Sequence, residues 1–251
     1  MTENELNSAA RAARLDQIKS DIDKYGFTVT LVPAEAIPRF AYTIGLINPL
    51  GFDLLMTGGS FYDQQAVHKI MSVIAATLRE DPTVRTVDLD TLGSFALRPA
   101  HQTWVRQLAL GAVDYYENKN VSMMQIVPDS SHVTIDVPNA SEPWASEREP
   151  VWRWVRESWE HPVPRNSVAT TNLAALKGEP ITEWMRWEED AWEMFAGPGP
   201  DVAAEDSRVV PLGTLLGADP SLQLAANVGI GTGYWRTDRG SEWTLWATKA
   251  N

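Results

Sequence analysis

Hydrophobic and polar residues follow a helical period in two segments of the first half of the chain. After Asp63, apolar residues recur on one helix face until Pro82 ends the pattern, which predicts a long helix. The apolar residues of that face are Val67, Ile70, Met71, Ile74, Ala75 and Leu78. A weaker pattern over residues 3–25 is followed by Gly26 and predicts a second helix that this glycine ends.

Two apolar segments before the long helix predict neighbouring strands, "FAYTIGL" at residues 40–46 and "FDLLMTG" at 52–58. In the first, alternation places Tyr42, Ile44 and Leu46 on one face. The other face then carries Ala41, Thr43 and Gly45. We expect Gly45 to lie where a helix or another backbone segment approaches the strand closely.

The second half is mostly β in pattern. Strands are predicted in "ITEWMRW" and "AWEMFAG" on either side of an acidic turn, and a hairpin is predicted in "GYWRTDRGSEWTLW". Between the halves, residues 138–165 are rich in proline and tryptophan, with a short helix whose Trp152, Val155 and Trp159 share one face. The patterns therefore predict an α+β fold of two small domains, each a mostly antiparallel sheet with packed helices. The expected domains are residues 1–137 and 166–251, joined by the connecting segment 138–165.

Composition narrows the classes of function. The 251 residues include no cysteine, which excludes disulfides and thiolate metal sites, and the formal net charge is −12 with no basic stripe. Direct nucleic-acid binding is therefore not expected. The N-terminal residues lack an apolar signal core, and no segment has the length and apolarity of a membrane helix. We expect a cytoplasmic, soluble protein that binds neither nucleic acid nor membranes.

Catalytic signatures are missing from the sequence. The four histidines have no metal-ligand spacing, no serine nucleophile motif occurs, and "MTGGS" at residues 56–60 lacks the lysine of a phosphate loop. We therefore expect no metal, no cofactor and no enzymatic activity. The alternative is an enzyme or a small-ligand or nucleotide-binding protein, with a pocket formed by Thr43, Gly58, Gly59 and Asp129.

Eleven tryptophans suit either core packing or the binding of a partner. The predicted hairpin of the second half combines aromatic residues with three consecutive carboxylates. Its candidate partner-binding residues are Trp187, Glu188, Glu189, Asp190 and Trp192. An acidic rim around an aromatic centre suits a basic protein. The other interpretation is a solvated turn whose tryptophans point inward.

The first half resembles a bacterial family known as domain of unknown function 4262. "YGFTVTLVP", "FAYTIGL" and "MMQIVPD" carry the resemblance, which covers about residues 15–130. The matching residues are Gly26, Tyr42, Thr43, Gly45, Leu46, Gln125 and Asp129. The sequence departs from the family after Asp129, where "SSHVTIDVPN" stands in place of a glycine and a Pro-Trp pair.

The second half, residues 167–246, is similar to small domains classed with immunity proteins of bacterial toxin systems (domain of unknown function 2185). The segments that carry this similarity are "VATTNLAALKGEPITEWMRWEEDAWEMFAG", "RVVPLGTLLGADPSL" and the closing hairpin. The resemblance implies a protein that binds a partner rather than one that transforms a substrate. We therefore expect a non-catalytic protein-binding module, such as an immunity or defence-associated protein that occludes its partner.

Overall fold

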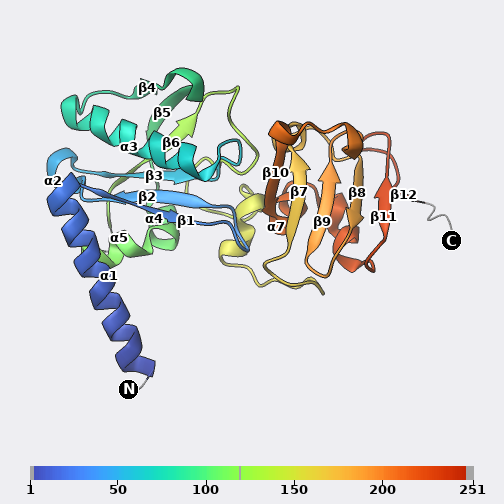
Figure 1. Ribbon diagram of the computed structural model, residues 1–251, viewed down its shortest axis with the longest axis horizontal. Helices are drawn as coiled ribbons and strands as arrows, with labels where there is room; N and C mark the ends of the chain where they lie inside the picture. The colour runs from blue at the N-terminus through green and yellow to red at the C-terminus, as the bar shows by residue number, and fades with distance from the viewer. Residues whose placement is uncertain (1–2, 119, 247–251) are drawn as a thin grey trace.

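The chain folds around two six-stranded β-sheets that lie side by side (Figure 1). The computed structural model describes residues 3–118 and 120–246. Both sheets are mixed and carry helices, which confirms the predicted α+β class with two mostly antiparallel sheets. Within those residues no helix is both long and apolar enough to cross a membrane.

The first sheet has the order β1-β2-β3-β6-β5-β4, and only the pairing of β3 with β6 is parallel. Its strands are β1 (Thr28–Val32), β2 (Phe40–Ile44), β3 (Asp53–Thr57), β4 (Thr86–Asp88), β5 (Ser94–Pro99) and β6 (Met123–Pro128). The two predicted strands around residues 40–46 and 52–58 are thus confirmed as β2 and β3, which pair antiparallel.

Helices cover both faces of this sheet. They are α1 (Glu3–Tyr25), α2 (Ile47–Leu50), α3 (Gln64–Glu80), η1 (Asp90–Leu92), α4 (Gln102–Leu108) and α5 (Leu110–Tyr115). The long predicted helix is confirmed as α3: all six residues of its apolar face are buried, and Asp63 caps it by accepting a hydrogen bond from the Ala66 N–H at 2.7 Å. Its apolar face covers one side of the sheet, while α4, α5 and the C-terminal half of α1 cover the other.

Alternation along β2 ends at Ile44. Tyr42 and Ile44 pack toward α4 and α5, whereas Ala41 packs toward α3, as predicted. The prediction that Leu46 shares the face of Tyr42 is wrong, because Leu46 packs in the α3 cluster. Gly45 has a φ of +118°, which turns the chain at this point, and the last turn of α1 approaches it closely.

The second sheet has the order β10-β7-β9-β8-β11-β12, and only β7 and β9 pair in parallel. Its strands are β7 (Val168–Asn172), β8 (Glu183–Arg186), β9 (Ala191–Phe195), β10 (Ser207–Pro211), β11 (Gly233–Trp235) and β12 (Thr244–Leu245). The helical segments are α6 (Leu173–Leu176), η3 (Gly199–Asp201), η4 (Ala204–Asp206), α7 (Leu212–Ala218) and η5 (Pro220–Asn227). Both predicted strand pairs, β8 with β9 and β11 with β12, are confirmed.

Helices α6, α7 and η5 bury only one face of this second sheet. Alternate strand residues such as Ala169, Trp184, Trp192 and Met194 point into that core. Residues of the opposite parity point to the other face, where Val209 is exposed and Glu193 and Met185 are half-buried. The open face therefore leaves side chains of the sheet available to a partner.

The connecting segment packs between the two sheets (Figure 1). It contains the short helix η2 (Pro150–Val155), in which Trp152 joins the first core and Trp154 donates a hydrogen bond to the Gly213 carbonyl of α7 at 3.3 Å. The predicted shared face of Trp152 and Trp159 is wrong, because this helix is a short 3₁₀ helix that ends at Val155. Trp159 lies beyond it and packs in the second core.

Candidate functional site

Strand register gathers aromatic and acidic side chains on the open face of the second sheet. Gly233 of β11 lies opposite Met185 of β8, which lies opposite Glu193 of β9. Trp246 follows β12 and donates its backbone N–H to the Gly233 carbonyl at 2.9 Å, which places it beside that row. Since glycine has no side chain, the Met185 side chain can pack over Gly233: a Cβ added there would lie 2.9 Å from Met185 Cε.

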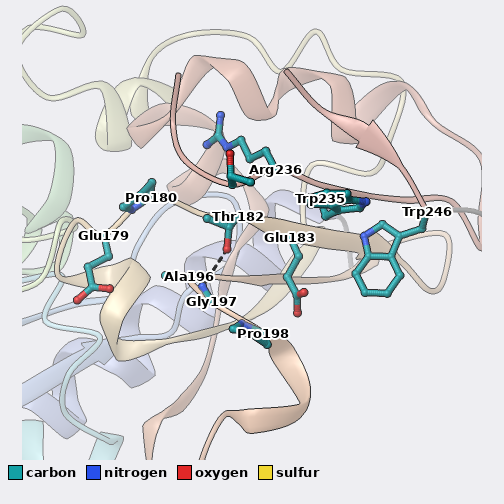
Figure 2. A pocket seen from close by; sticks show the side chains of 11 residues that line it. Glu179, Pro180, Thr182, Glu183, Ala196, Gly197, Pro198, Trp235, Arg236 and Trp246 are labelled. Carbon is teal, nitrogen blue, oxygen red and sulfur yellow. Dashed lines mark hydrogen bonds between the residues drawn. The ribbon is translucent and has the colours of Figure 1, made fainter. Parts of the chain in front are cut away.

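The next row along the same face pairs Trp235 of β11 with Glu183 of β8. These residues and Trp246 line a cavity of about 610 Å³, closed at the other side by Pro180, Gly197 and Pro198 (Figure 2). Trp235 is 43% exposed and Trp246 is 41% exposed, so both rings have surface available for a ligand.

Arg236 also lines this cavity, but its positive charge is neutralised within the fold. The guanidinium is buried, forms a 2.8 Å ion pair with Asp219 and donates to the Ile181 carbonyl. Among the residues that the structure describes, Glu179 and Glu183 form no ion pair, so their carboxylates supply negative charge at the rim.

A second cavity of about 370 Å³ adjoins the first and shares Glu183 and Trp246 with it. Trp187 and Glu193 line its far side, and the Trp187 Nε1–H donates to Glu193 Oε2 at 2.7 Å. We call the two cavities together the Trp–Glu groove, defined by Glu183, Trp187, Glu193, Trp235 and Trp246.

Four of the five candidate partner-binding residues of the acidic hairpin are exposed, and the fifth is buried. Trp187 is 52% exposed, and Glu188, Glu189 and Asp190 are exposed in the turn. Trp192 is buried instead: its Nε1–H donates to the Ala225 carbonyl at 3.1 Å. The expectation of Trp192 at a contact surface is therefore wrong, since alternation along β9 turns it into the core with Met194.

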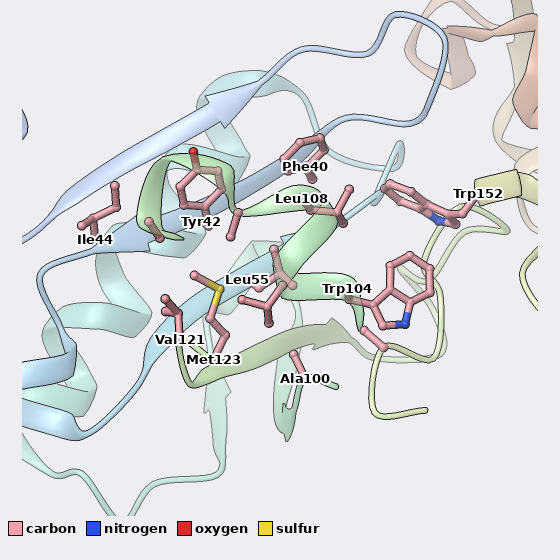
Figure 3. Close-up of a cluster of buried hydrophobic side chains, with 14 of the residues drawn as sticks. Phe40, Tyr42, Ile44, Leu55, Ala100, Trp104, Leu108, Val121, Met123 and Trp152 are labelled. Carbon is pink, nitrogen blue, oxygen red and sulfur yellow. The ribbon is translucent and has the colours of Figure 1, made fainter. Parts of the chain in front are cut away.

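The four candidate ligand-pocket residues are engaged in the fold. Thr43 is buried; its hydroxyl donates to Asp53 Oδ1 at 2.7 Å and accepts from the Leu54 N–H at 2.8 Å. The neighbouring Tyr42 ring points into the packed cluster that Figure 3 shows. Thr43 consequently presents no hydroxyl to a ligand.

Asp53 is a buried carboxyl with three hydrogen-bond donors. Besides Thr43, the Leu46 N–H donates to Oδ1 at 3.1 Å and the Tyr116 hydroxyl donates to Oδ2 at 2.7 Å. Burial raises the pKa of Asp53 to about 6, although the hydrogen bonds to the carboxyl, that of Tyr116 foremost, oppose this shift.

Gly58 and Gly59 both have positive φ and form the turn that follows β3. A Cβ on Gly58 would collide with the carbonyl of Asp136, so the site is filled by the chain itself. The Asp136 carboxylate then accepts from the N–H and the hydroxyl of Ser60. The segment "MTGGS" is therefore a turn that requires positive φ at two positions.

Another cavity, of about 650 Å³, lies beside this turn between the two sheets and is lined by Arg39 and Arg208. Arg39 donates to the carbonyls of Gly59 and Tyr62, and Arg208 donates to those of Ser60 and Phe61. Carboxylates of Asp63 and Glu205 also line it. Both cations therefore bind the turn, and Arg208, which lies on β10, also joins the second sheet to the first.

Asp129 and Gln125, which carry the resemblance of the first half, fix the chain after β6. Asp129 accepts from the backbone of Ser94 and from His132 Nδ1, each at 2.8 Å, and these contacts lower its pKa to about 2. Gln125 is buried and donates to Thr57 Oγ1 at 3.0 Å and to the Pro138 carbonyl at 2.8 Å. Both residues are thus structural.

A comparison with known protein families matches one region of the chain. The model of the family described as "Domain of unknown function (DUF4262)" matches residues 21–133, in agreement with the resemblance of the first half. No curated protein and no solved structure matches the chain. Across the described residues, no group of three or more histidine or acidic side chains is arranged to bind a metal ion.

Proposed function

We propose that the protein is a non-catalytic protein-binding module and that the Trp–Glu groove is its contact surface. One observation carries the proposal: three tryptophans, Trp187, Trp235 and Trp246, are each more than 40% exposed on one open sheet face. Exposed aromatic clusters of this kind supply the buried area of protein interfaces. A single exposed tryptophan would not indicate a protein interface.

Charge indicates a basic partner. The whole chain has a net charge of −12, and residues 151–251 contain 14 acidic residues against nine lysines and arginines. The exposed turn of Glu188, Glu189 and Asp190 lies directly beside Trp187. These carboxylates would steer a positively charged surface toward the groove, an effect that salt screens.

The resemblance of residues 167–246 to immunity domains supports an occluding mode of action. An immunity or defence-associated protein needs only to cover the working surface of its partner, and a rigid sheet face suits that task. The structural roles of Thr43, Gln125 and Asp129 also favour binding over catalysis, because their polar groups are already paired.

Small-ligand binding is the second candidate, and the 650 Å³ cavity beside Ser60 favours it. A thermal-shift screen with nucleotides and inorganic phosphate distinguishes the two, because a bound ligand raises the melting temperature. A phosphate-dependent shift that Arg208→Gln abolishes would support the ligand-binding function instead.

The proposal is tested by affinity capture from the native host with paired variants. Replacing Trp187, Trp235 and Trp246 together by serine should abolish capture of the partner, while Leu110→Ser, an exposed apolar position of the first half, should not. The purified partner must then bind the wild-type protein in calorimetry. A partner captured equally by both variants would refute the groove as the contact surface.

Association kinetics with that partner test the steering role of the acidic turn. Glu188, Glu189 and Asp190 replaced together by serine should leave the fold intact, because Arg186 binds the turn through the backbone carbonyls of residues 188 and 189. The change should lower the association rate constant about tenfold at low salt and reduce its salt dependence. An unchanged rate constant would exclude the turn from the encounter.

A further inference from the structure

The Trp–Glu groove consists of two neighbouring subsites of similar chemistry. The larger cavity has the Trp235 ring with the Glu183 carboxylate, and the smaller has the Trp187 ring with the Glu193 carboxylate. Trp246 lines both cavities. Each subsite therefore offers carboxylate and tryptophan surface to one side chain of a partner, and Glu183 lines both cavities.

Both carboxylates are oriented by one fixed donor. Glu183 Oε1 accepts from the Gly199 N–H, and Glu193 Oε2 accepts from Trp187 Nε1. Among the residues that the structure describes, the second oxygen of each carboxylate accepts no hydrogen bond. Each subsite thus has a positioned acceptor for a cationic donor, with an aromatic face nearby for a cation–π contact.

Strand register sets the spacing of the two carboxylates. Met185 lies opposite Glu193 and Glu183 lies opposite Phe195, so Glu183 and Glu193 are diagonal neighbours on one face. Diagonal positions on paired antiparallel strands are about 7–8 Å apart. In an extended chain, side chains two residues apart point to the same side and are separated by about 6.8 Å.

We propose that the groove binds an extended segment of the partner that carries lysine or arginine at two alternate positions, Lys-x-Lys in pattern. The inference rests on the proposed function and adds the recognised sequence to it. Charge complementarity selects this occupant, because Glu179 at the rim adds a further carboxylate and Arg236 is already paired with Asp219. The aliphatic parts of the two cationic side chains would pack on Trp235, Trp246 and Trp187.

Blocked synthetic peptides test the spacing. The probes are Gly-Lys-Ser-Lys-Gly, its isomer Gly-Lys-Lys-Ser-Gly with adjacent lysines, and a version of the first with norleucine for both lysines. We measure dissociation constants by tryptophan fluorescence and calorimetry with the full chain at low salt. The first peptide should bind about tenfold more tightly than its isomer, and the norleucine peptide should bind at least tenfold more weakly than the first.

Matched variants assign the subsites. Glu183→Gln and Glu193→Gln should each weaken the alternate-lysine peptide about three- to tenfold and reduce its preference over the isomer. Glu188→Gln removes the same charge from the exposed turn outside the cavities and should leave that preference unchanged. Equal binding of the two isomers, or no binding of either, overturns the inference.

These outcomes are distinct from failure of the proposed function. A captured partner that needs the three tryptophans but shows no alternate-lysine preference would refute only the recognised pattern. A partner that binds the tryptophan variants as well as the wild type would refute the groove as the contact surface. Sedimentation tests whether a second copy of the chain covers the groove. A dimer that the three tryptophan replacements dissociate would show that it does and would overturn the inference.

Discussion

Replacing Asp53 by asparagine is expected to change how the stability of the protein depends on pH. The wild-type carboxyl is fully buried and accepts from Thr43, Leu46 and Tyr116. Burial raises its pKa from 3.8 to about 6 in the folded protein. Asparagine has nearly the same shape and can keep the bonds from Thr43 and Leu46, but it does not ionise.

The magnitude follows from the shift. A difference of roughly two pKa units corresponds to about 3 kcal/mol, at about 1.4 kcal/mol per unit. Because the folded-state pKa is raised, the protonated carboxyl contributes stability that is fully present below about pH 4. That contribution is lost as the pH rises through about 6. The stability of the wild type relative to Asp53→Asn should therefore fall by about 3 kcal/mol between pH 4 and 7.5.

Urea unfolding followed by tryptophan fluorescence measures this difference at each pH. Other titrating groups are common to both proteins, so their contributions cancel in the comparison. Asp88→Asn, an exposed position on β4, is the control and should show no comparable change. A free-energy difference between wild type and Asp53→Asn that stays constant from pH 4 to 7.5 would refute a raised pKa at this site.

Three further predictions concern single residues. Asp129→Asn should remove a contribution to stability whose pH dependence is opposite to that of Asp53. The pKa of Asp129 is lowered to about 2, so its ionised carboxylate stabilises the fold above about pH 4, and this stabilisation is lost as the pH falls through 2. Acid unfolding of wild type and variant measures the difference. Trp192→Ala should lower the free energy of unfolding by about 3–5 kcal/mol, whereas exposed Trp187→Ala should change it by less than about 1 kcal/mol, both by urea titration. Gly58→Ala should destabilise by more than about 1 kcal/mol in the same assay, because φ is +68° and the Asp136 carbonyl occupies the space of the added Cβ.

Local signals in the sequence were sufficient for α3 and for the β2–β3 pair. The helix has a strong hydrophobic period over 17 residues and a side-chain cap at Asp63. Tertiary contacts do not override a helical pattern of that length. Prediction failed where one residue changed the path of the chain. At Gly45 the positive φ interrupts the alternation, so Leu46 reaches the opposite core.

The candidate site was only partly predictable, for a different reason. Alternation in "AWEMF" already places Trp192 with Met194 and Glu193 on the other face, so the inward direction of Trp192 could have been read from the sequence. The pairing of Trp235 with Glu183 could not, because the register of β8 against β11 joins residues about fifty positions apart. Trp246 likewise reaches the groove through the pairing of β12 with β11 and its own backbone bond to Gly233.

The groove and the matched family region lie in different parts of the fold. The family match therefore gives no information about binding at the groove. The match covers residues 21–133, whereas every residue that lines the two cavities of the Trp–Glu groove lies between 179 and 246. Hydrogen bonds still join the two parts: Arg208 binds the Ser60 and Phe61 carbonyls, and the Ile135 N–H donates to the Leu176 carbonyl at 2.7 Å. Those bonds are made at β10 and α6, while the groove lies toward the opposite edge of the second sheet, near β12 (Figure 1). A partner can therefore occupy the groove without approaching the first sheet, and the specificity proposed above belongs to the second sheet alone.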